Sequence, residues 1–241
     1  GVDQAFIIQN SVIGDCNEYI SEAVARYPKR FFASVQVDPF SKDAASTLEH
    51  YASLSRPNVF KMEISEQYGW SGMHRDLRVF DSPGMSDLWD IALKYKMAVM
   101  FDTGLIGTNG YQTEQFAKLA DAYPSLPIII EHGCMCKNDF DTDSELRPQW
   151  DAMAELGRKE NIYMGLTAIV ETAGNMERAM WVLEHLLNIA GERKIVWGSD
   201  IPGNMRFWTY NNMIEWAEKA PCLTERQKDL FLAQNMLDMF K

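Results

Sequence analysis

Four sites along the chain combine reactive side chains with the end of an apolar, strand-like run. They are Lys61 with Glu63, Asp102, Glu131 with His132, and Asp200. Carboxylate and imidazole groups can move protons as general acids and bases, or they can bind a divalent metal. If the runs are parallel strands, their carboxyl ends meet at one mouth, so these residues would share a pocket although they are far apart in the sequence. The pattern therefore indicates an enzyme.

Asp200 follows the last of these runs, in the sequence IVWGSDIP at 195–202. A short apolar strand cannot hydrate a carboxylate within itself, so the side chain should project from the carboxyl end of the strand. We predict that Asp200 is catalytic, as a proton acceptor, or a metal ligand. The alternative is a carboxylate that only caps the Gly- and Pro-rich turn at 201–203.

His132 ends the very apolar run PIIIEH at 127–132 and is followed by a glycine. We predict a catalytic role for it, as a general base or as a metal ligand. The alternative is an imidazole at the edge of the core that is hydrogen-bonded to a backbone carbonyl.

Three further residues are candidates for binding substrate. Lys61 alternates with Met62 and should share one face with Glu63, where the two could also simply pair with each other. Asp102, in FDTG at 101–104, could be a site residue or could only form the turn. Arg206, in RFWTY at 206–210, could bind an acid group with its guanidinium in a pocket lined by these aromatic residues, which could instead only pack under the last helices.

The elements that must position these residues alternate regularly along the chain. Runs rich in β-branched and aromatic residues predict seven strands, at 4–9, 31–37, 59–64, 97–102, 127–132, 162–166 and 194–198. Amphipathic patterns predict helices at 17–27, 44–55, 85–95, 114–123, 145–159, 176–190, 211–219 and 225–237. Such alternation is typical of α/β proteins with a parallel sheet.

The architecture we expect is a (β/α)8 TIM barrel whose first strand lies upstream of these residues. Only one glycine follows the first run, so the Gly-rich loop of a nucleotide-binding sheet is absent. A closed barrel needs eight strands, and a seven-stranded one would leave two edges and an apolar lumen exposed. No linker or low-complexity segment interrupts the pattern, and we expect one domain over 1–241.

The composition of the chain limits the kinds of molecule that it can bind. The 241 residues carry a formal net charge of −11, which opposes binding to nucleic acid or to an anionic membrane surface. No window has the roughly 18 apolar residues of a membrane span, and no basic segment precedes an apolar leader. With four cysteines in no disulfide or zinc pattern, we expect a cytoplasmic protein with a small-molecule substrate.

Taken in order, several segments resemble the amidohydrolase-related TIM-barrel enzymes, a branch that includes aminocarboxymuconate-semialdehyde decarboxylase and pyrone-dicarboxylate lactonase. The segment GVDQAFIIQ at 1–9 is similar to the second strand of that family, and YPKRF at 27–31 with QVDP at 36–39 to the third. PIIIEHG at 127–133 resembles the sixth strand, GSDIP at 198–202 the eighth, and NMLDMF at 235–240 the closing helix.

The resemblance implies site roles by position. His132 matches the histidine of the sixth strand, and Asp200 the aspartate of the eighth. The His-x-His pair of the first strand does not occur in these residues, and Asp102 stands where the fifth strand usually carries a histidine. The resemblance thus implies a divalent metal, zinc or manganese, with Asp102 and Asp200 as ligands, and the oxygen-rich set shifts the preference from zinc toward manganese or magnesium.

The expected function is hydrolysis of an ester, lactone or amide bond in a small carboxylated cyclic or aromatic compound. One alternative is a metal-dependent decarboxylase that acts on a hydroxylated aromatic or muconate-like acid. Another is a catalytically silent barrel that binds without turnover. The resemblance also implies a homodimer.

Overall fold

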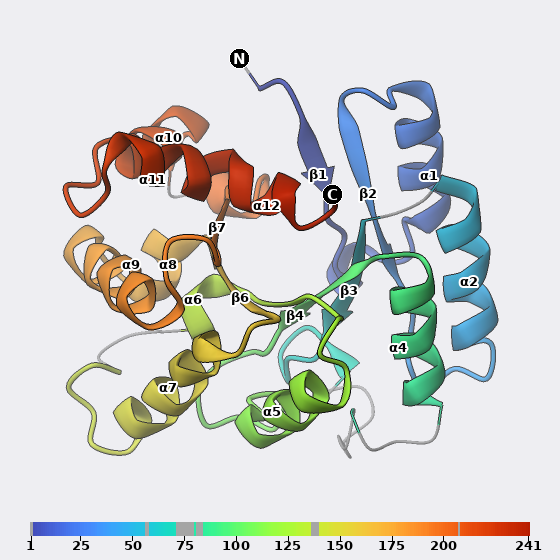
Figure 1. Cartoon of the computed structure of the whole chain (residues 1–241), viewed down its shortest axis with the longest axis horizontal. Helices are drawn as coiled ribbons and strands as arrows, with labels where there is room; N and C mark the ends of the chain where they lie inside the picture. Colours follow the sequence, from blue (N-terminus) through green and yellow to red (C-terminus); the bar gives the residue numbers. More distant parts are fainter. Residues whose placement is uncertain (1, 56–57, 71–79, 81–83, 136–139, 207) are drawn as a thin grey trace.

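The seven expected strands are all present and form one parallel sheet. The computed structural model describes residues 2–55, 58–70, 80, 84–135, 140–206 and 208–241. The strands are β1 (Ala5–Ile7), β2 (Phe31–Gln36), β3 (Val59–Glu63), β4 (Ala98–Asp102), β5 (Ile128–Ile130), β6 (Ile162–Thr167) and β7 (Ile195–Gly198). Each pairs with the next in sequence order, and the sheet curls into a half-barrel of the TIM-barrel type (Figure 1). The predicted fold class is confirmed.

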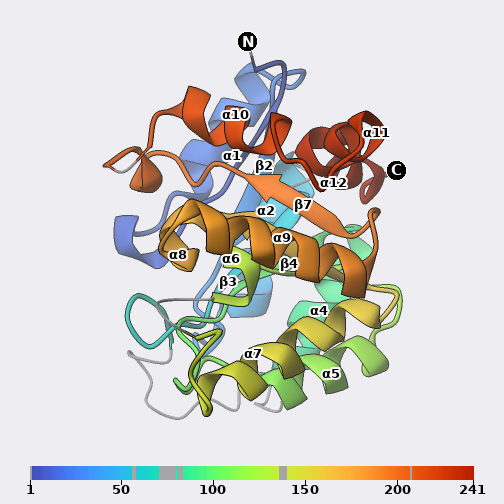
Figure 2. The same cartoon turned by 90° about the vertical axis from the view of Figure 1, so that its left-hand side faces the viewer.

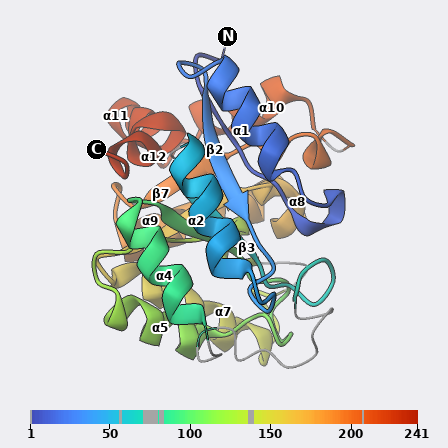
Figure 3. The same ribbon diagram turned by 90° about the vertical axis from the view of Figure 1, so that its right-hand side faces the viewer.

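Helices cover the outside of the curled sheet. They are α1 (Asn17–Arg26), α2 (Ala44–Ser55), α4 (Met85–Lys94), α5 (Thr113–Ala122), α6 (His132–Met135), α7 (Leu146–Glu155), α8 (Ile169–Ala173), α9 (Met176–Ala190), α10 (Tyr210–Glu218), α11 (Glu225–Asp229) and α12 (Asn235–Asp238). The short helix α8 was not predicted, because five residues are too few to show a helical period, and the α6 segment is a turn with left-handed backbone at His132, Gly133 and Cys134. Helices α7 and α9 pack against each other, and α9 lies next to β7 (Figure 2), while α1, α2 and α4 lie in a row outside β2 and β3 (Figure 3).

Two of the expected helices are interrupted. The segment at 145–159 continues from α7 into the 3-10 helix η2 (Leu156–Arg158), and the segment at 225–237 contains the π-helical turn η4 (Leu230–Gln234) between α11 and α12. Thr224 caps α11, as its position at the start of the apolar pattern predicts: its hydroxyl accepts a hydrogen bond from the backbone N–H of Gln227. In the part of the chain that the structure describes, no helix is long and apolar enough to cross a membrane.

The strand register decides which side chains enter the barrel. Gln36 lies opposite Lys61, Lys61 opposite Met100, and Glu63 opposite Asp102. Since side chains alternate across a strand, these residues share the inner face. The inner face is apolar before the carboxyl ends of the strands, where it is filled by a small cluster around Val59, Ala98, Met100, Ile129 and Val196. The polar side chains follow it at the carboxyl ends.

The C-terminal segment lies between β7 and β1. Met164 N of β6 donates to the carbonyl of Lys194, so the next carbonyl of β7, that of Ile195, points away from β6. The side-chain amide of Asn235 donates to this carbonyl at 2.7 Å. Phe240 packs against Phe6 of β1 with ring centroids 5.5 Å apart, and the C-terminal end lies beside β1 (Figure 1). The α12 region therefore covers the two sheet edges that do not pair.

Candidate active site

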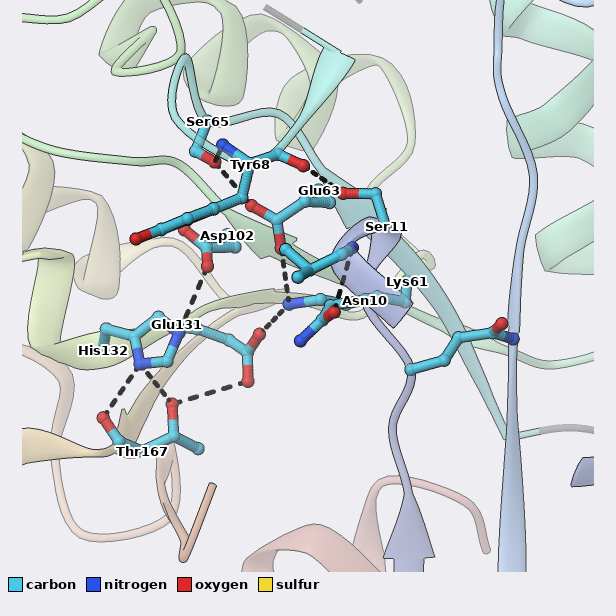
Figure 4. Close-up of polar contacts among 12 residues, drawn as sticks. Asn10, Ser11, Lys61, Glu63, Ser65, Tyr68, Asp102, Glu131, His132 and Thr167 are labelled. Atoms are coloured by element: carbon cyan, nitrogen blue, oxygen red, sulfur yellow. Dashed lines mark hydrogen bonds and ion pairs between the residues drawn. The ribbon is translucent and has the colours of Figure 1, made fainter. Parts of the chain in front are cut away.

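The polar residues at the carboxyl ends of the strands form a connected cluster (Figure 4). At one end of the cluster, the ammonium of Lys61 donates to Oε2 of Glu131 and lies 4.0 Å from Oε2 of Glu63. The hydroxyl of Ser65 donates to Oε1 of Glu63 at 2.7 Å. The predicted pairing of Lys61 with Glu63 is present, but Glu131 is the closer partner.

Burial makes the charges of this cluster interdependent. Burial alone would lower the pKa of Lys61, but attraction to Glu131, Glu63 and Asp102 outweighs it and raises that pKa above its ordinary value. For Glu63, burial and the nearby Asp102 carboxylate raise the pKa to about 8, so its carboxyl is mostly protonated at neutral pH. Glu63 thus places a neutral acid next to the Lys61–Glu131 ion pair.

At the other end of the cluster, both ring nitrogens of His132 face oxygen acceptors. Nε2 lies 3.4 Å from Oδ2 of Asp102, and Nδ1 lies 3.0 Å from the carbonyl oxygen of Thr167. A carbonyl and a carboxylate can only accept, so each nitrogen must carry a proton to bond there, and the doubly protonated ring satisfies both. Burial acts against the charge, but Asp102 outweighs it and raises the pKa of His132 to about 10.

Asp102 combines the two roles that its sequence left open. Its Oδ1 accepts a hydrogen bond from the backbone N–H of Gly104 at 3.0 Å, which shapes the turn, while Oδ2 faces His132. Burial would raise its pKa, yet the attraction and hydrogen bond of His132 prevail and lower it. Asp102 and His132 form a charged pair at neutral pH.

Thr167 joins the two ends of the cluster. Its hydroxyl oxygen lies 3.0 Å from Nδ1 of His132 and donates to Oε1 of Glu131 at 3.5 Å. Position 198 on the neighbouring strand must be small, because a Cβ added to Gly198 would overlap Cγ2 of Thr167. The glycine of the β7 motif therefore makes room for the threonine that orients His132.

Asp200 differs from Lys61, Asp102 and His132 because it is exposed. Among the described residues no hydrogen bond to its carboxylate is found, so it does not cap the turn in the way the alternative required. Partial desolvation, with Glu131 and Asp102 nearby, raises its pKa, although His132 and Lys61 act in the opposite direction. A carboxylate with a raised pKa and no hydrogen-bonded partner is suited to accept a proton.

Three non-glycine residues at neighbouring strand ends have left-handed backbones. The φ angles are 58° at His132 after β5, 48° at Ala168 after β6 and 52° at Asp200 after β7. Such conformations cost of order 1–3 kcal/mol each and tend to cluster at functional sites. Two of the three residues are the predicted catalytic residues, and at each of them the chain changes direction where the strand ends.

Arg206 lies on the 3-10 helix η3 (Gly203–Arg206), directly after the Asp200 turn, and its side chain is exposed. The structure therefore brings Lys61, Asp102 and His132 into one cluster, with Asp200 close enough to influence their charges, and leaves Arg206 outside it.

The donor set does not fit the expected metal. Among the described residues, no group of three or more His, Cys, Asp or Glu side chains is arranged to hold a metal ion. A ligating histidine needs a free nitrogen lone pair, whereas both nitrogens of His132 face acceptors. Asp102 is already engaged by His132 and Gly104, and the cation among the neighbouring carboxylates is Lys61. We therefore derive no chemical step through a metal.

The chain belongs to the amidohydrolase family, whose model matches residues 1–241. No curated protein sequence matches it. Among solved structures it is similar to a protein assigned as a 2-pyrone-4,6-dicarboxylic acid hydrolase from Pseudomonas putida, with a TM-score of 0.78 and 16% identity over 100% of this chain and 82% of that one. A protein with the same assignment from Acinetobacter baumannii, with citric acid bound, gives 0.76 and 15% over 99% and 83%. The 5-carboxyvanillate decarboxylase of Sphingomonas paucimobilis gives 0.66 and 16% over 100% and 79%.

The sequence did not single out Ser65 or Thr167, and it did not indicate the partner of Glu131. Thr167 was placed one residue beyond the sixth predicted strand, although the alternation from Tyr163 through Gly165 points inward to it. Glu131 was noted beside His132, but nothing in the sequence indicated that it binds Lys61 across the intervening strand β4.

Proposed function

We propose that this amidohydrolase-family protein hydrolyses an ester, lactone or amide bond of a small carboxylated cyclic or aromatic compound. The observation that carries the proposal is the contrast between two neighbouring groups. His132 is a buried imidazolium with a raised pKa, and Asp200 is an exposed carboxylate without a hydrogen-bonded partner among the described residues. One group can stabilise negative charge while the other accepts a proton.

In the proposed reaction, Asp200 takes a proton from water as the water oxygen attacks the carbonyl carbon. Negative charge then develops on the carbonyl oxygen, and the charged His132 stabilises it. The 3.4 Å contact between Nε2 of His132 and Asp102 is a long hydrogen bond, so a substrate oxygen can accept from the same N–H. When the carbon–oxygen or carbon–nitrogen bond breaks, the leaving group takes the proton held by Asp200.

The remaining residues hold the charges in place. Asp102 and Thr167 keep His132 protonated and oriented, and Glu131 connects this pair to Lys61. Arg206 is the candidate to bind a substrate acid group at the rim of the mouth, since guanidinium binds carboxylates through two hydrogen bonds. The similarity to the two proteins assigned as dicarboxylic acid hydrolases supports a carboxylated substrate.

Decarboxylation of a hydroxylated aromatic acid is the second candidate. The similarity to 5-carboxyvanillate decarboxylase supports it. In that reaction His132 or Asp200, in its protonated form, would deliver a proton to the ring carbon as carbon dioxide leaves. The same charged histidine serves both reactions, so the two differ in the bond that breaks.

A substrate screen with two readouts tests the proposal. Purified protein is incubated with 2-pyrone-4,6-dicarboxylate, other lactones and hydroxylated benzoates, and both acid release and carbon dioxide are measured. Hydrolysis of an ester or lactone releases a proton at pH 8 without carbon dioxide, whereas decarboxylation releases carbon dioxide. Either activity should disappear in Asp200→Asn. Binding without turnover across the whole panel would instead identify a silent barrel.

A further inference from the structure

Gln36 has a buried side-chain amide that makes no hydrogen bond in the described part of the structure. Only 8% of the residue is exposed, and neither Nε2 nor Oε1 has a hydrogen-bond partner among the described residues. Buried amides are nearly always hydrogen-bonded, because leaving donor and acceptor unpaired destabilises the fold. An amide that is kept in this state requires an explanation.

Gln36 lies in the mouth that contains the candidate site. It ends β2, and its Cα is the register partner of Lys61, so both side chains are on the inner face of the barrel. Its backbone is fixed, because its N–H donates to Oδ1 of Asn17 at 3.0 Å and its carbonyl accepts from Nδ2 of Asn17 at 2.7 Å. The end of the strand is thus held by the scaffold while the amide itself remains unused.

We infer that the amide of Gln36 binds a neutral oxygen of the substrate ring, either a hydroxyl group or a lactone carbonyl, and so contributes to substrate specificity. An amide has donors and an acceptor, which match a hydroxyl group, and its donors match a carbonyl oxygen. The nearest cation, Lys61, is already paired with Glu131. A second carboxylate would therefore find little net positive charge beside Gln36. This inference rests on the proposed function, because it assumes a cyclic substrate in the same mouth.

The amide is closed off from solvent in this structure, because both polar atoms of the Gln36 side chain are inaccessible. Elsewhere in the mouth, the hydroxyl of Ser11, after β1, donates to the carbonyl of Tyr68, after β3, and this contact lies beside Glu63 and Lys61 (Figure 4). A ligand can reach the amide only if the side chains around it move.

The chain offers a matched control in Gln9, which is 1% exposed. Its Nε2 donates to Oδ1 of Asn17 at 2.6 Å, and its Oε1 accepts from the backbone N–H of Cys16 at 3.0 Å. Gln9 and Gln36 are the same residue type with similar burial, but only Gln9 is hydrogen-bonded. Methionine matches glutamine in length without its polar atoms, so Gln→Met isolates the contribution of the amide.

The first measurement is thermal unfolding without ligand. Gln36→Met should raise Tm by roughly 2–4 °C, because it removes an unpaired buried amide. Gln9→Met should lower Tm, because it removes a hydrogen bond to Asn17 and leaves the backbone N–H of Cys16 without its acceptor. A fall in Tm for Gln36→Met comparable to that of Gln9→Met would show that Gln36 has a structural partner, and would overturn the inference.

The second measurement is binding of benzoate and 2-hydroxybenzoate, which differ by one hydroxyl group, by isothermal titration calorimetry. The wild-type protein should bind 2-hydroxybenzoate roughly tenfold more tightly than benzoate, and Gln36→Met should bind the two equally. An unchanged ratio in the variant, or no binding of either acid at millimolar concentration, would overturn the inference. If the ratio collapses as expected but the substrate screen finds no turnover, the assignment of Gln36 holds and the proposed reaction fails.

Discussion

Replacing Asp102 with Asn tests whether this carboxylate keeps His132 charged. With Nε2 and Oδ2 3.4 Å apart and an effective dielectric constant of about 20, the attraction between the two groups is about 5 kcal/mol. The rise in the pKa of His132 from 6.5 to about 10 corresponds to roughly the same free energy. The two magnitudes are similar, and Asp102 is the foremost of the groups that raise this pKa against the opposing effect of burial. In Asp102→Asn the pKa of His132 should fall by about 3.5 units or more, to 6.5 or below, because burial continues to disfavour the charge.

The variant is designed to keep the turn intact. An asparagine at 102 retains an oxygen for the N–H of Gly104, and its amide N–H can donate to Nε2 of a neutral His132. The pKa is measured by NMR titration of the histidine ring signals, with the His132 signals assigned by their loss in His132→Gln and with exposed His50 as an internal reference. Circular dichroism at pH 8 checks the fold. A His132 pKa that stays within one unit of its wild-type value would refute the reasoning.

Three more predictions follow from the same cluster. Asp200→Asn should abolish turnover and change Tm by less than about 2 °C, since no hydrogen bond to the carboxylate is found in the described chain; a large loss of stability would show a structural cap. The pKa of Glu63 is about 8 in the folded protein and 4.5 in the unfolded chain, so its contribution to stability is fully present below pH 4.5 and is lost as the pH rises through 8. The free energy of unfolding in urea should therefore fall less between pH 5 and pH 9 in Glu63→Gln, which can still accept the hydrogen bond of Ser65, than in the wild-type protein. An equal fall in both proteins would contradict the raised pKa. Gly198→Ala should destabilise the protein by about 1–3 kcal/mol in chemical denaturation and should lower the pKa of His132, because the new methyl group displaces Thr167. If the stability and the His132 pKa both keep their wild-type values, the strand can shift to accept the methyl group.

The sequence allowed prediction of the strands and of the reactive residues at their carboxyl ends. Each strand is a short apolar run rich in β-branched residues, and such a run can be recognised from residues that are adjacent in the sequence. Asp102, His132 and Asp200 were found because a polar residue after an apolar run marks a strand end. The fold class then followed from the regular alternation of strands and helices.

The partners of these residues could not be predicted in the same way. The contact of Lys61 with Glu131 joins β3 to the end of β5 across β4, so it depends on barrel curvature and on rotamers rather than on spacing along the chain. The doubly protonated His132 depends on a backbone carbonyl of Thr167, which carries no signal in residue type. Likewise, the sequence shows Gln36 as an ordinary polar residue, and only the absence of a hydrogen-bonded partner in the described structure sets it apart from Gln9.

The contact between Phe6 and Phe240 has a consequence for how the protein folds. These residues are separated by nearly the whole chain, so closing the loop between them costs more conformational entropy than any local contact repays. Contacts of such sequence separation slow folding and tend to form after the neighbouring strands have paired. A fluorescent or NMR probe at Phe240 should therefore report the last step of folding, and its signal should be the first to be lost when denaturant is added.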